Sequence, residues 1–402
     1  MEAAALNLLQ SAGVTDTALV GPLQSDIFAS FWIAGFESAC QINSLRQRVD
    51  MIAGVQHDIQ ALEDYRMLPE AGMGAARDGL RWPLIDRGGA LDFGSFLPML
   101  RAALETGTQI IWNLCHYGYP DDLDIFSAQF VDRFARYAGA AARLVREHSD
   151  SVPFYAPINE ISFFTWAATR DIIYPFAHGR DDELKQQLIR AVIAGCEAIW
   201  DVDRRARFVY PEPIIQVFPP RSQPERAAEA AAFTESQYQA WDMIAGKLQP
   251  ELGGHERYLD ILGANYYHSN QWDLTSGRLR WEDEPRDERW IPLHQLLGRI
   301  WERYRRPLFI AETSHFGSGR ARWIREIGRE VCQARQLGTP VDGVCLYPIL
   351  DRYDWENPAH WHNSGLWDLE REPDGRLKRL INAEYLSALQ EAQHLNATPA
   401  CA

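Results

Sequence analysis

The chain has 402 residues, which is enough for one large α/β barrel or for two to three ordinary domains. A hydrophobic content of 46% is typical of a globular protein. The formal net charge of −15 argues against a nucleic-acid groove and against an anionic membrane surface as partners.

Eight short β-rich runs alternate with helical patterns along the chain. The candidate strands are residues 31–35, 74–79, 109–115, 154–159, 207–211, 259–267, 307–312 and 341–348. The helical patterns include residues 51–68, 93–106, 127–147, 184–201, 292–303 and 321–336. Eight strand–helix units predict an α/β fold of the (β/α)8 TIM-barrel type. Because no linker-like tract divides the chain, we expect a single catalytic domain over residues 1–402, with its core at about 28–393.

Two of the candidate strands end on a glutamate. The run from residue 154 is apolar until Asn159 and Glu160, and the run from residue 307 ends on Glu312. A buried carboxylate is costly unless it has a partner or a task. Because the carboxyl ends of barrel strands form the site in this fold, two such glutamates predict a pair of facing carboxylates, the arrangement used in glycoside hydrolysis. Either glutamate alone would be better explained as a salt-bridged strand end.

Seven short motifs over roughly residues 31–369 resemble those of the family 1 glycoside hydrolases, the β-glucosidase family. In chain order they are Ser38-Ala39-Cys40-Gln41-Ile42; His57-Asp58-Ile59 with residues 72–77 and Trp82-Pro83; residues 114–120; Asn159-Glu160; Asn265-Tyr266-Tyr267; Ala311-Glu312-Thr313; and residues 347–355 with Gly365-Leu366. Each motif alone is weak, but seven in the family's order and spacing are specific.

The resemblance implies a retaining mechanism with two catalytic residues. Glu312 would attack the anomeric carbon, and Glu160 would protonate the leaving oxygen and then activate water. Arg77 would keep Glu312 ionised, and Tyr267 would donate a hydrogen bond to it. Glu160 would be the carboxyl with the raised pKa, because the charge of Glu312 opposes its ionisation. Asn159 would hold the 2-hydroxyl of the sugar.

The resemblance also implies which residues bind the other sugar hydroxyls, namely Gln41, His116, Asp354 and Trp355. Outside the barrel context, His116 would be explained as a core histidine. Tyr347 replaces the Trp that begins the family's last motif, and we include it among the substrate-binding residues. Asp354 replaces a Glu that is one methylene longer, so we expect glucosides, galactosides and fucosides to be cleaved within about tenfold of one another.

We expect a small, non-phosphorylated glycoside as the substrate and no cofactor. Residues 355–368 contain no Lys or Arg that would pair with a sugar phosphate. His360 and His362 lie two residues apart in a Trp-rich loop, without a third ligand at a recognisable spacing, so we expect no metal site.

Three other titratable residues, Glu37, Glu212 and His315, lie near strand ends, where they suit a pocket wall without a specified role. Glu212 equally suits a surface salt bridge. Two alternatives to a hydrolase stay open: a transglycosylase that uses the same intermediate, and a catalytically silent barrel that binds sugar. A barrel without catalytic activity is disfavoured, because Arg77 and Tyr267 are present together with both glutamates.

The cellular setting follows from what the sequence contains. The six cysteines stand singly without a C-x-x-C pair, so we expect reduced thiols. The first ten residues contain Glu2 and no basic residue, unlike a secretory leader. No apolar run approaches the roughly 20 residues of a membrane span. We therefore expect a cytoplasmic protein without membrane or nucleic-acid partners, and homo-oligomerisation stays open.

Overall fold

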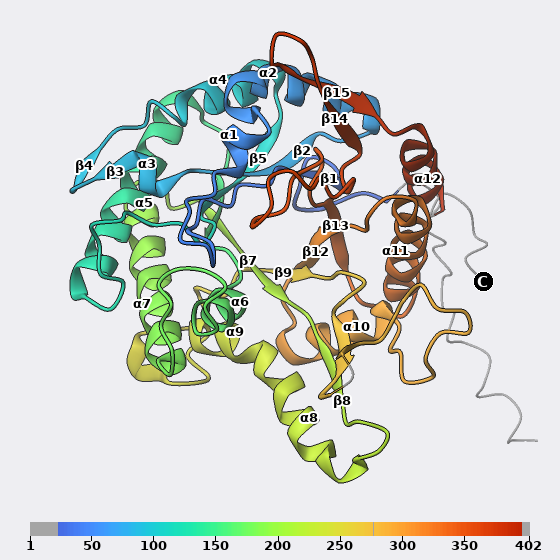
Figure 1. Cartoon of the computed structure of the whole chain (residues 1–402). Helices are drawn as coiled ribbons and strands as arrows, with labels where there is room; N and C mark the ends of the chain where they lie inside the picture. Colours follow the sequence, from blue (N-terminus) through green and yellow to red (C-terminus); the bar gives the residue numbers. More distant parts are fainter. Residues whose placement is uncertain (1–22, 276, 396–402) are drawn as a thin grey trace, which may run out of the picture.

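Eight parallel strands close into a barrel at the centre of the molecule (Figure 1). The computed structural model describes residues 23–275 and 277–395. Within these ranges the barrel confirms the (β/α)8 fold that the strand–helix alternation predicts. In order around the barrel, the strands are β1 (Trp32–Gly35), β2 (Ala75–Gly79), β5 (Gln109–Cys115), β6 (Phe154–Ile158), β7 (Arg207–Pro213), β9 (Ile261–Asn265), β12 (Leu308–Thr313) and β13 (Val341–Leu346).

The barrel interior is filled by small and branched side chains from alternating strand positions, as a barrel of this size requires. This inner core includes Ile33, Ala75, Ile111, Val209 and Ile261. Phe28 packs against Phe154 and Phe309, with ring centroids 5.5 and 4.9 Å away. Because both partners lie at the start of their strands, Phe28 closes the amino-terminal end of the barrel. In this fold the functional site lies at the opposite end of the barrel, where the strands have their carboxyl ends.

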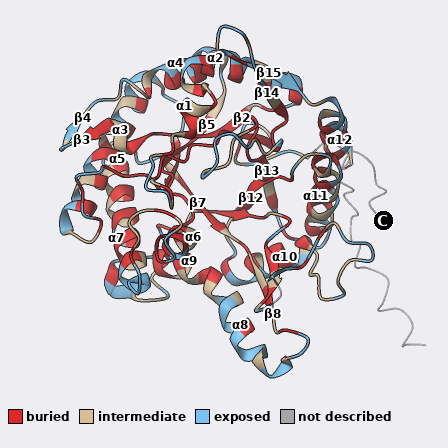
Figure 2. Cartoon of the chain, in the orientation of Figure 1, coloured by how far each residue is buried: buried red, intermediate tan, exposed pale blue. Residues whose placement is uncertain are grey.

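Helices surround the barrel, and their apolar faces form the outer core (Figure 2). In α5, for example, the buried residues Phe130, Phe134, Tyr137 and Ala141 recur every three or four positions. The helices are α1 (Met51–Gly54), α2 (His57–Met67), α3 (Trp82–Ile85), α4 (Leu97–Thr106), α5 (Ala128–His148), α6 (Ile161–Ala168), α7 (Asp181–Trp200), α8 (Ala227–Glu235), α9 (Gln239–Ile244), α10 (Leu293–Tyr304), α11 (Gly319–Gln336) and α12 (Ala383–His394). Within the described ranges, no helix has the length and apolarity needed to cross a membrane.

The prediction of one helix over residues 51–68 is wrong, because the chain breaks between α1 and α2. Gln56 adopts a positive φ of 60°, which interrupts the helix. Gly54 lies against the ring of Tyr353, where a Cβ atom would come within 2.2 Å of the tyrosine hydroxyl oxygen. The close approach of this ring ends α1 at a residue without a side chain.

The segments that connect the barrel strands to the helices contain additional short strands. A three-stranded sheet has the order β11-β10-β8 and lies in the loops after β7 and β9. Two hairpins complete the set. The bounds are β3 (Asp86–Arg87), β4 (Ala90–Leu91), β8 (Gln216–Phe218), β10 (Gln271–Asp273), β11 (Gly277–Arg278), β14 (Trp367–Arg371) and β15 (Leu377–Ile381).

Candidate active site

A cavity of about 310 Å³ opens at the carboxyl ends of the barrel strands. Its wall includes Glu160, the second residue after β6, and Glu312, near the end of β12. Both side chains are buried. The volume is at the lower end of the range for ligand sites and suits one sugar ring better than a chain of them. Other lining residues are Glu37, His116, Tyr117, Phe163, Tyr267, Tyr347, Arg352 and Trp355.

Two donors hold the carboxyl group of Glu312. Nη1 of Arg77, on β2, donates to Oε1 at 2.6 Å, and the hydroxyl of Tyr267 donates to Oε2 at 2.7 Å. Arg77 is fully buried, and its Nε donates to Oδ1 of Asn113 at 3.1 Å. A buried guanidinium is very costly without an anionic partner. Glu312 is the anionic partner of this buried cation.

The carboxyl group of Glu160 has a different environment, in which no cation from the described residues 23–275 and 277–395 binds it. The hydroxyl of Tyr117 donates to Oε2, and Nδ2 of Asn265 donates to Oε1 at 2.8 Å. Burial and the charge of Glu312 raise the pKa of Glu160 to about 8, against the opposing effect of these two hydrogen bonds. The carboxyl group of Glu160 is therefore protonated at neutral pH.

The backbone at this point is strained. Glu160 has φ 43° and ψ 65°, in the left-handed region, and Tyr117 has φ 65°. For residues other than glycine such conformations cost about 1–3 kcal/mol and cluster at functional sites. The turn at Glu160 lets the chain leave β6 and begin α6 while the carboxyl group stays on the cavity wall.

Asn159 hydrogen bonds both to Arg77, the partner of Glu312, and to Tyr117, the partner of Glu160. Its Oδ1 accepts a hydrogen bond from Nη2 of Arg77. Its Nδ2 donates to the hydroxyl of Tyr117 at 3.0 Å and to Nε2 of His116 at 3.1 Å. Because oxygen and nitrogen have different partners, the orientation of the amide is fixed.

His116 and Glu37 form a polar end of the cavity. Nε2 of His116 accepts from Asn159, so Nδ1 carries the proton, 3.2 Å from the hydroxyl of Tyr347. Burial, reinforced by nearby arginines, holds the pKa of His116 well below its usual value, so the ring is neutral. Oε2 of Glu37 lies 3.7 Å from Nε of Arg352. Burial raises the pKa of Glu37, although Arg352 opposes this.

The structure brings eight of the ten predicted site residues together. Arg77 and Asn159 hydrogen bond to residues of the cavity wall, Arg77 to Glu312 and Asn159 to His116. The predicted residues that line the cavity are His116, Glu160, Tyr267, Glu312, Tyr347 and Trp355. Their roles in chemistry or sugar binding stay predictions.

Gln41 lies outside the cavity lining. Its side chain is buried, and neither of its polar atoms hydrogen bonds to a residue of 23–275 or 277–395. Glu37, two residues after the end of β1, lines the cavity in this part of the chain. The role of Gln41 in sugar binding therefore stays a prediction.

Asp354 also lies outside the lining, and its carboxylate caps a turn. Oδ1 accepts from the backbone amides of Glu356 and Asn357 at 2.9 and 3.1 Å. Oδ2 lies 3.3 Å from Nε2 of His362. Oδ1 thus holds a turn, and the role of Asp354 in sugar preference stays a prediction.

Tyr117, Asn265 and Arg352 were missed as site residues by sequence reasoning. Each lies inside a motif quoted above, so its position at or beyond the carboxyl end of a barrel strand was the available signal. Glu212 is buried rather than a surface residue, and it accepts the backbone N–H of Ser162 at 3.0 Å. Burial raises the pKa of Glu212 to about 7, against the hydrogen bonds from Ser162.

The sequence matches no protein-family model and no curated protein. Solved structures of β-glucosidases nevertheless share its fold. A family 1 β-glucosidase from Thermotoga maritima has a TM-score of 0.69 at 15% identity, over 93% of this chain and 98% of that one. The Thermotoga maritima β-glucosidase in complex with deoxynojirimycin has a TM-score of 0.69 at 14% identity, over 94% and 100%. A hyperthermophilic β-glucosidase mutant has a TM-score of 0.68 at 16% identity, over 89% and 97%. At such identities the likeness establishes the shared barrel fold.

Proposed function

We propose that this protein is a retaining β-glycosidase that hydrolyses small, non-phosphorylated β-glucoside-like substrates through a covalent glycosyl-enzyme. The observation that carries the proposal is the pair of buried glutamates on one cavity wall, with one carboxyl group bound to a cation and the other protonated. Retaining hydrolysis needs this asymmetry, because one carboxyl attacks while the other delivers a proton. The β-glucosidase fold of the structural neighbours agrees with the proposal.

In the first step Glu312 attacks the anomeric carbon, and the bond from that carbon to the leaving oxygen breaks. Arg77 and Tyr267 hold the two oxygens of Glu312 and so aim the carboxylate. Glu160 gives its proton to the leaving oxygen, which departs as an alcohol. A pKa of about 8 keeps the group protonated at neutral pH yet acidic enough to transfer the proton.

In the second step the roles of Glu160 reverse. Once Glu312 is esterified its negative charge is gone, and one of the causes that raise the pKa of Glu160 disappears. Glu160, now ionised, takes a proton from a water molecule, whose oxygen attacks the anomeric carbon. Glu312 leaves as a carboxylate, and the sugar is released with its original configuration.

The sugar binds against the polar end of the cavity. The neutral ring of His116 and the carboxyl group of Glu37 present hydrogen-bonding atoms there, and the indole of Trp355 offers an apolar face. Arg352 also lines the cavity, but its Nε lies 3.7 Å from Oε2 of Glu37. A sugar phosphate would meet that carboxyl group as well as the cation, so a neutral sugar fits better.

A second cavity of about 760 Å³ adjoins the first and suits the leaving group. The two cavities share Phe163, Pro213, Ser269 and Asn270 in their walls. Three further aromatic residues line the larger one: Trp166, Phe233 and Trp272. Such a wall favours an aromatic or glycosyl leaving group through stacking.

The test is a screen of p-nitrophenyl glycosides at neutral pH, followed by proton NMR of early turnover with the best substrate. We expect cleavage of β-glucoside-like substrates and release of the β-anomer first. Initial release of the α-anomer would contradict retention, and cleavage of none of the glycosides would contradict the proposed activity.

A further inference from the structure

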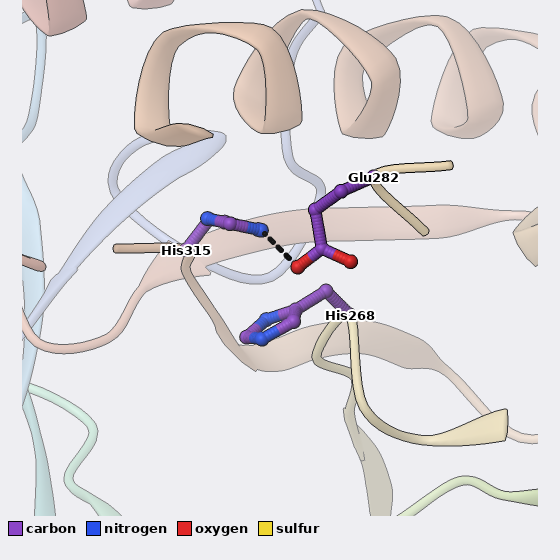
Figure 3. A group of neighbouring side chains, drawn as sticks. All are labelled: His268, Glu282 and His315. Atoms are coloured by element: carbon purple, nitrogen blue, oxygen red, sulfur yellow. Dashed lines mark hydrogen bonds and ion pairs between the residues drawn. The ribbon is translucent and has the colours of Figure 1, made fainter. Parts of the chain in front are cut away.

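Two histidines and one glutamate, His268, His315 and Glu282, form a cluster at the wall of the active-site cavity, which His268 lines (Figure 3). One ligand atom from each of His268, Glu282 and His315 lies within 4.8 Å of the others. Nε2 of His315 is 3.3 Å from Oε1 of Glu282, and the two imidazole centroids are 4.2 Å apart. The residues come from three segments: the loops after β9, β11 and β12. No spacing pattern in the sequence reveals them, and they are distinct from His360 and His362.

Two atoms of the cluster lack the partners that buried polar atoms normally have. Nδ1 of His268 and Oε2 of Glu282 are buried and make no hydrogen bond within the described part of the chain. The two histidine residues are themselves only 3% and 6% exposed. An imidazole nitrogen in its unprotonated tautomer and a carboxylate oxygen are both lone-pair donors to a metal, so two such unsatisfied atoms in one cluster point to a cation as their partner.

The ring of His315 is held in place by packing. A Cβ atom on Gly319, at the start of α11, would come within 2.2 Å of Nδ1 of His315, so only glycine leaves room for the ring. The indole of Trp281 lies 5.1 Å away on another side. Nδ1 of His315 accepts the backbone N–H of Phe316 at 2.8 Å and also lies 3.1 Å from the carbonyl oxygen of Phe316. Metal binding through Nε2 requires the tautomer in which Nδ1 carries the proton and donates it to that carbonyl oxygen.

We propose that His268, Glu282 and His315 bind a divalent transition-metal ion of the Zn²⁺ type. Two imidazoles and one carboxylate are a ligand set that Zn²⁺ takes with a fourth position left open. Mg²⁺ and Ca²⁺ prefer oxygen ligands and fit less well. The separation of 3.3 Å between His315 and Glu282 is near that of neighbouring ligands around Zn²⁺.

Two adjustments accompany binding. The ring of His268 moves closer to the other two ligands by about 1 Å, since Zn–N bonds are about 2.0–2.1 Å long. Nη2 of Arg278, which now donates to Oε1 of Glu282 at 3.4 Å, moves away. Its side chain is 40% exposed, so this movement costs little packing.

The metal would join the loop that carries Glu282 to the wall of the active-site cavity. His268 lines that cavity, as do Ser314 and Phe316, the two neighbours of His315. Binding would thus stabilise the folded chain and order this wall, whatever reaction takes place in the cavity.

The experiment titrates zinc into chelator-treated, dialysed protein by calorimetry, and records the visible spectrum of the cobalt-loaded protein. The variants are His268→Ala, His315→Ala and the isosteric Glu282→Gln. The matched control is His294→Ala, because His294 is half-buried and bonds one glutamate, Glu330, at 2.8 Å. Near-ultraviolet circular dichroism checks that each variant is folded.

We expect one zinc ion per chain and a rise in melting temperature of roughly 3 °C near saturation. Each of the three variants should lose affinity by about a hundredfold or more, while His294→Ala binds like the wild type. Cobalt should give the intense visible bands of a four-coordinate site. Absence of stoichiometric zinc binding by the wild type, or unchanged binding by folded His268→Ala and His315→Ala, would overturn the proposal. Neither result depends on glycosidase activity.

Discussion

The hydrogen bond from Tyr117 to Glu160 offers a direct way to move the pH optimum. Removal of this hydroxyl in Tyr117→Phe takes a donor from the ionised carboxylate, so the ionised form becomes less stable and the pKa of Glu160 rises. A hydrogen bond to a charged group contributes about 1.5–3 kcal/mol, and about 1.4 kcal/mol equals one pKa unit. Because Asn265 still donates at 2.8 Å, we expect a shift of about one unit.

The assay is the pH dependence of kcat/KM, which reports the pKa values of the free enzyme. A general acid must be protonated, so activity falls as the pH rises through the pKa of Glu160, which is about 8. In Tyr117→Phe this alkaline limb should lie about one unit higher. The control is Tyr119→Phe, which removes another buried hydroxyl outside the cavity lining and should leave the limb in place. An unmoved limb in Tyr117→Phe, or a shift to lower pH, would refute the reasoning.

Three further predictions concern the same cavity. Glu312→Ala should lose at least about a thousandfold in rate and regain activity with azide as an α-glycosyl azide, whereas Glu160→Ala should give the β-product and keep activity on good leaving groups; the opposite pattern in product NMR would exchange the two roles. Arg77→Met removes the cation beside Glu312 and should lower the free energy of unfolding, measured by urea denaturation, by about 3–5 kcal/mol. A loss below about 1 kcal/mol would show that the ion pair of Arg77 and Glu312 contributes no more than a surface ion pair. Glu37→Gln should lower kcat/KM by about tenfold to a hundredfold, and Asp354→Asn by less than about twofold; a larger effect of Asp354→Asn would identify Asp354 as a sugar ligand.

The fold was predictable because its signals are local. Most barrel strands are short, largely apolar runs, and the helices between them repeat with the period of an amphipathic helix. The polar residues at the strand ends marked the site, since the barrel brings these ends together wherever they lie in the sequence. For this reason the sequence alone predicts that Glu160 and Glu312 lie on one cavity.

Side-chain direction was not predictable from the same signals. A motif alignment places Gln41 and Asp354 along the chain but not in space. In the structure Asp354 accepts two backbone amides instead of facing the cavity, which depends on the local turn. The cluster of His268 and His315 arises where separate loops meet, and neither periodicity nor spacing encodes such a meeting.

The central claim is that Glu312 forms the covalent intermediate, and trapping that intermediate tests it most directly. A dinitrophenyl 2-deoxy-2-fluoro-β-glycoside slows both steps, but its good leaving group lets the first proceed. Mass spectrometry of the intact chain and of its peptides should then show one sugar per chain, attached to Glu312 and absent from Glu312→Gln. A sugar attached to Glu160 or Glu37 would contradict the assignment. Turnover of the parent glycoside with inverted product and no adduct would contradict the covalent mechanism itself.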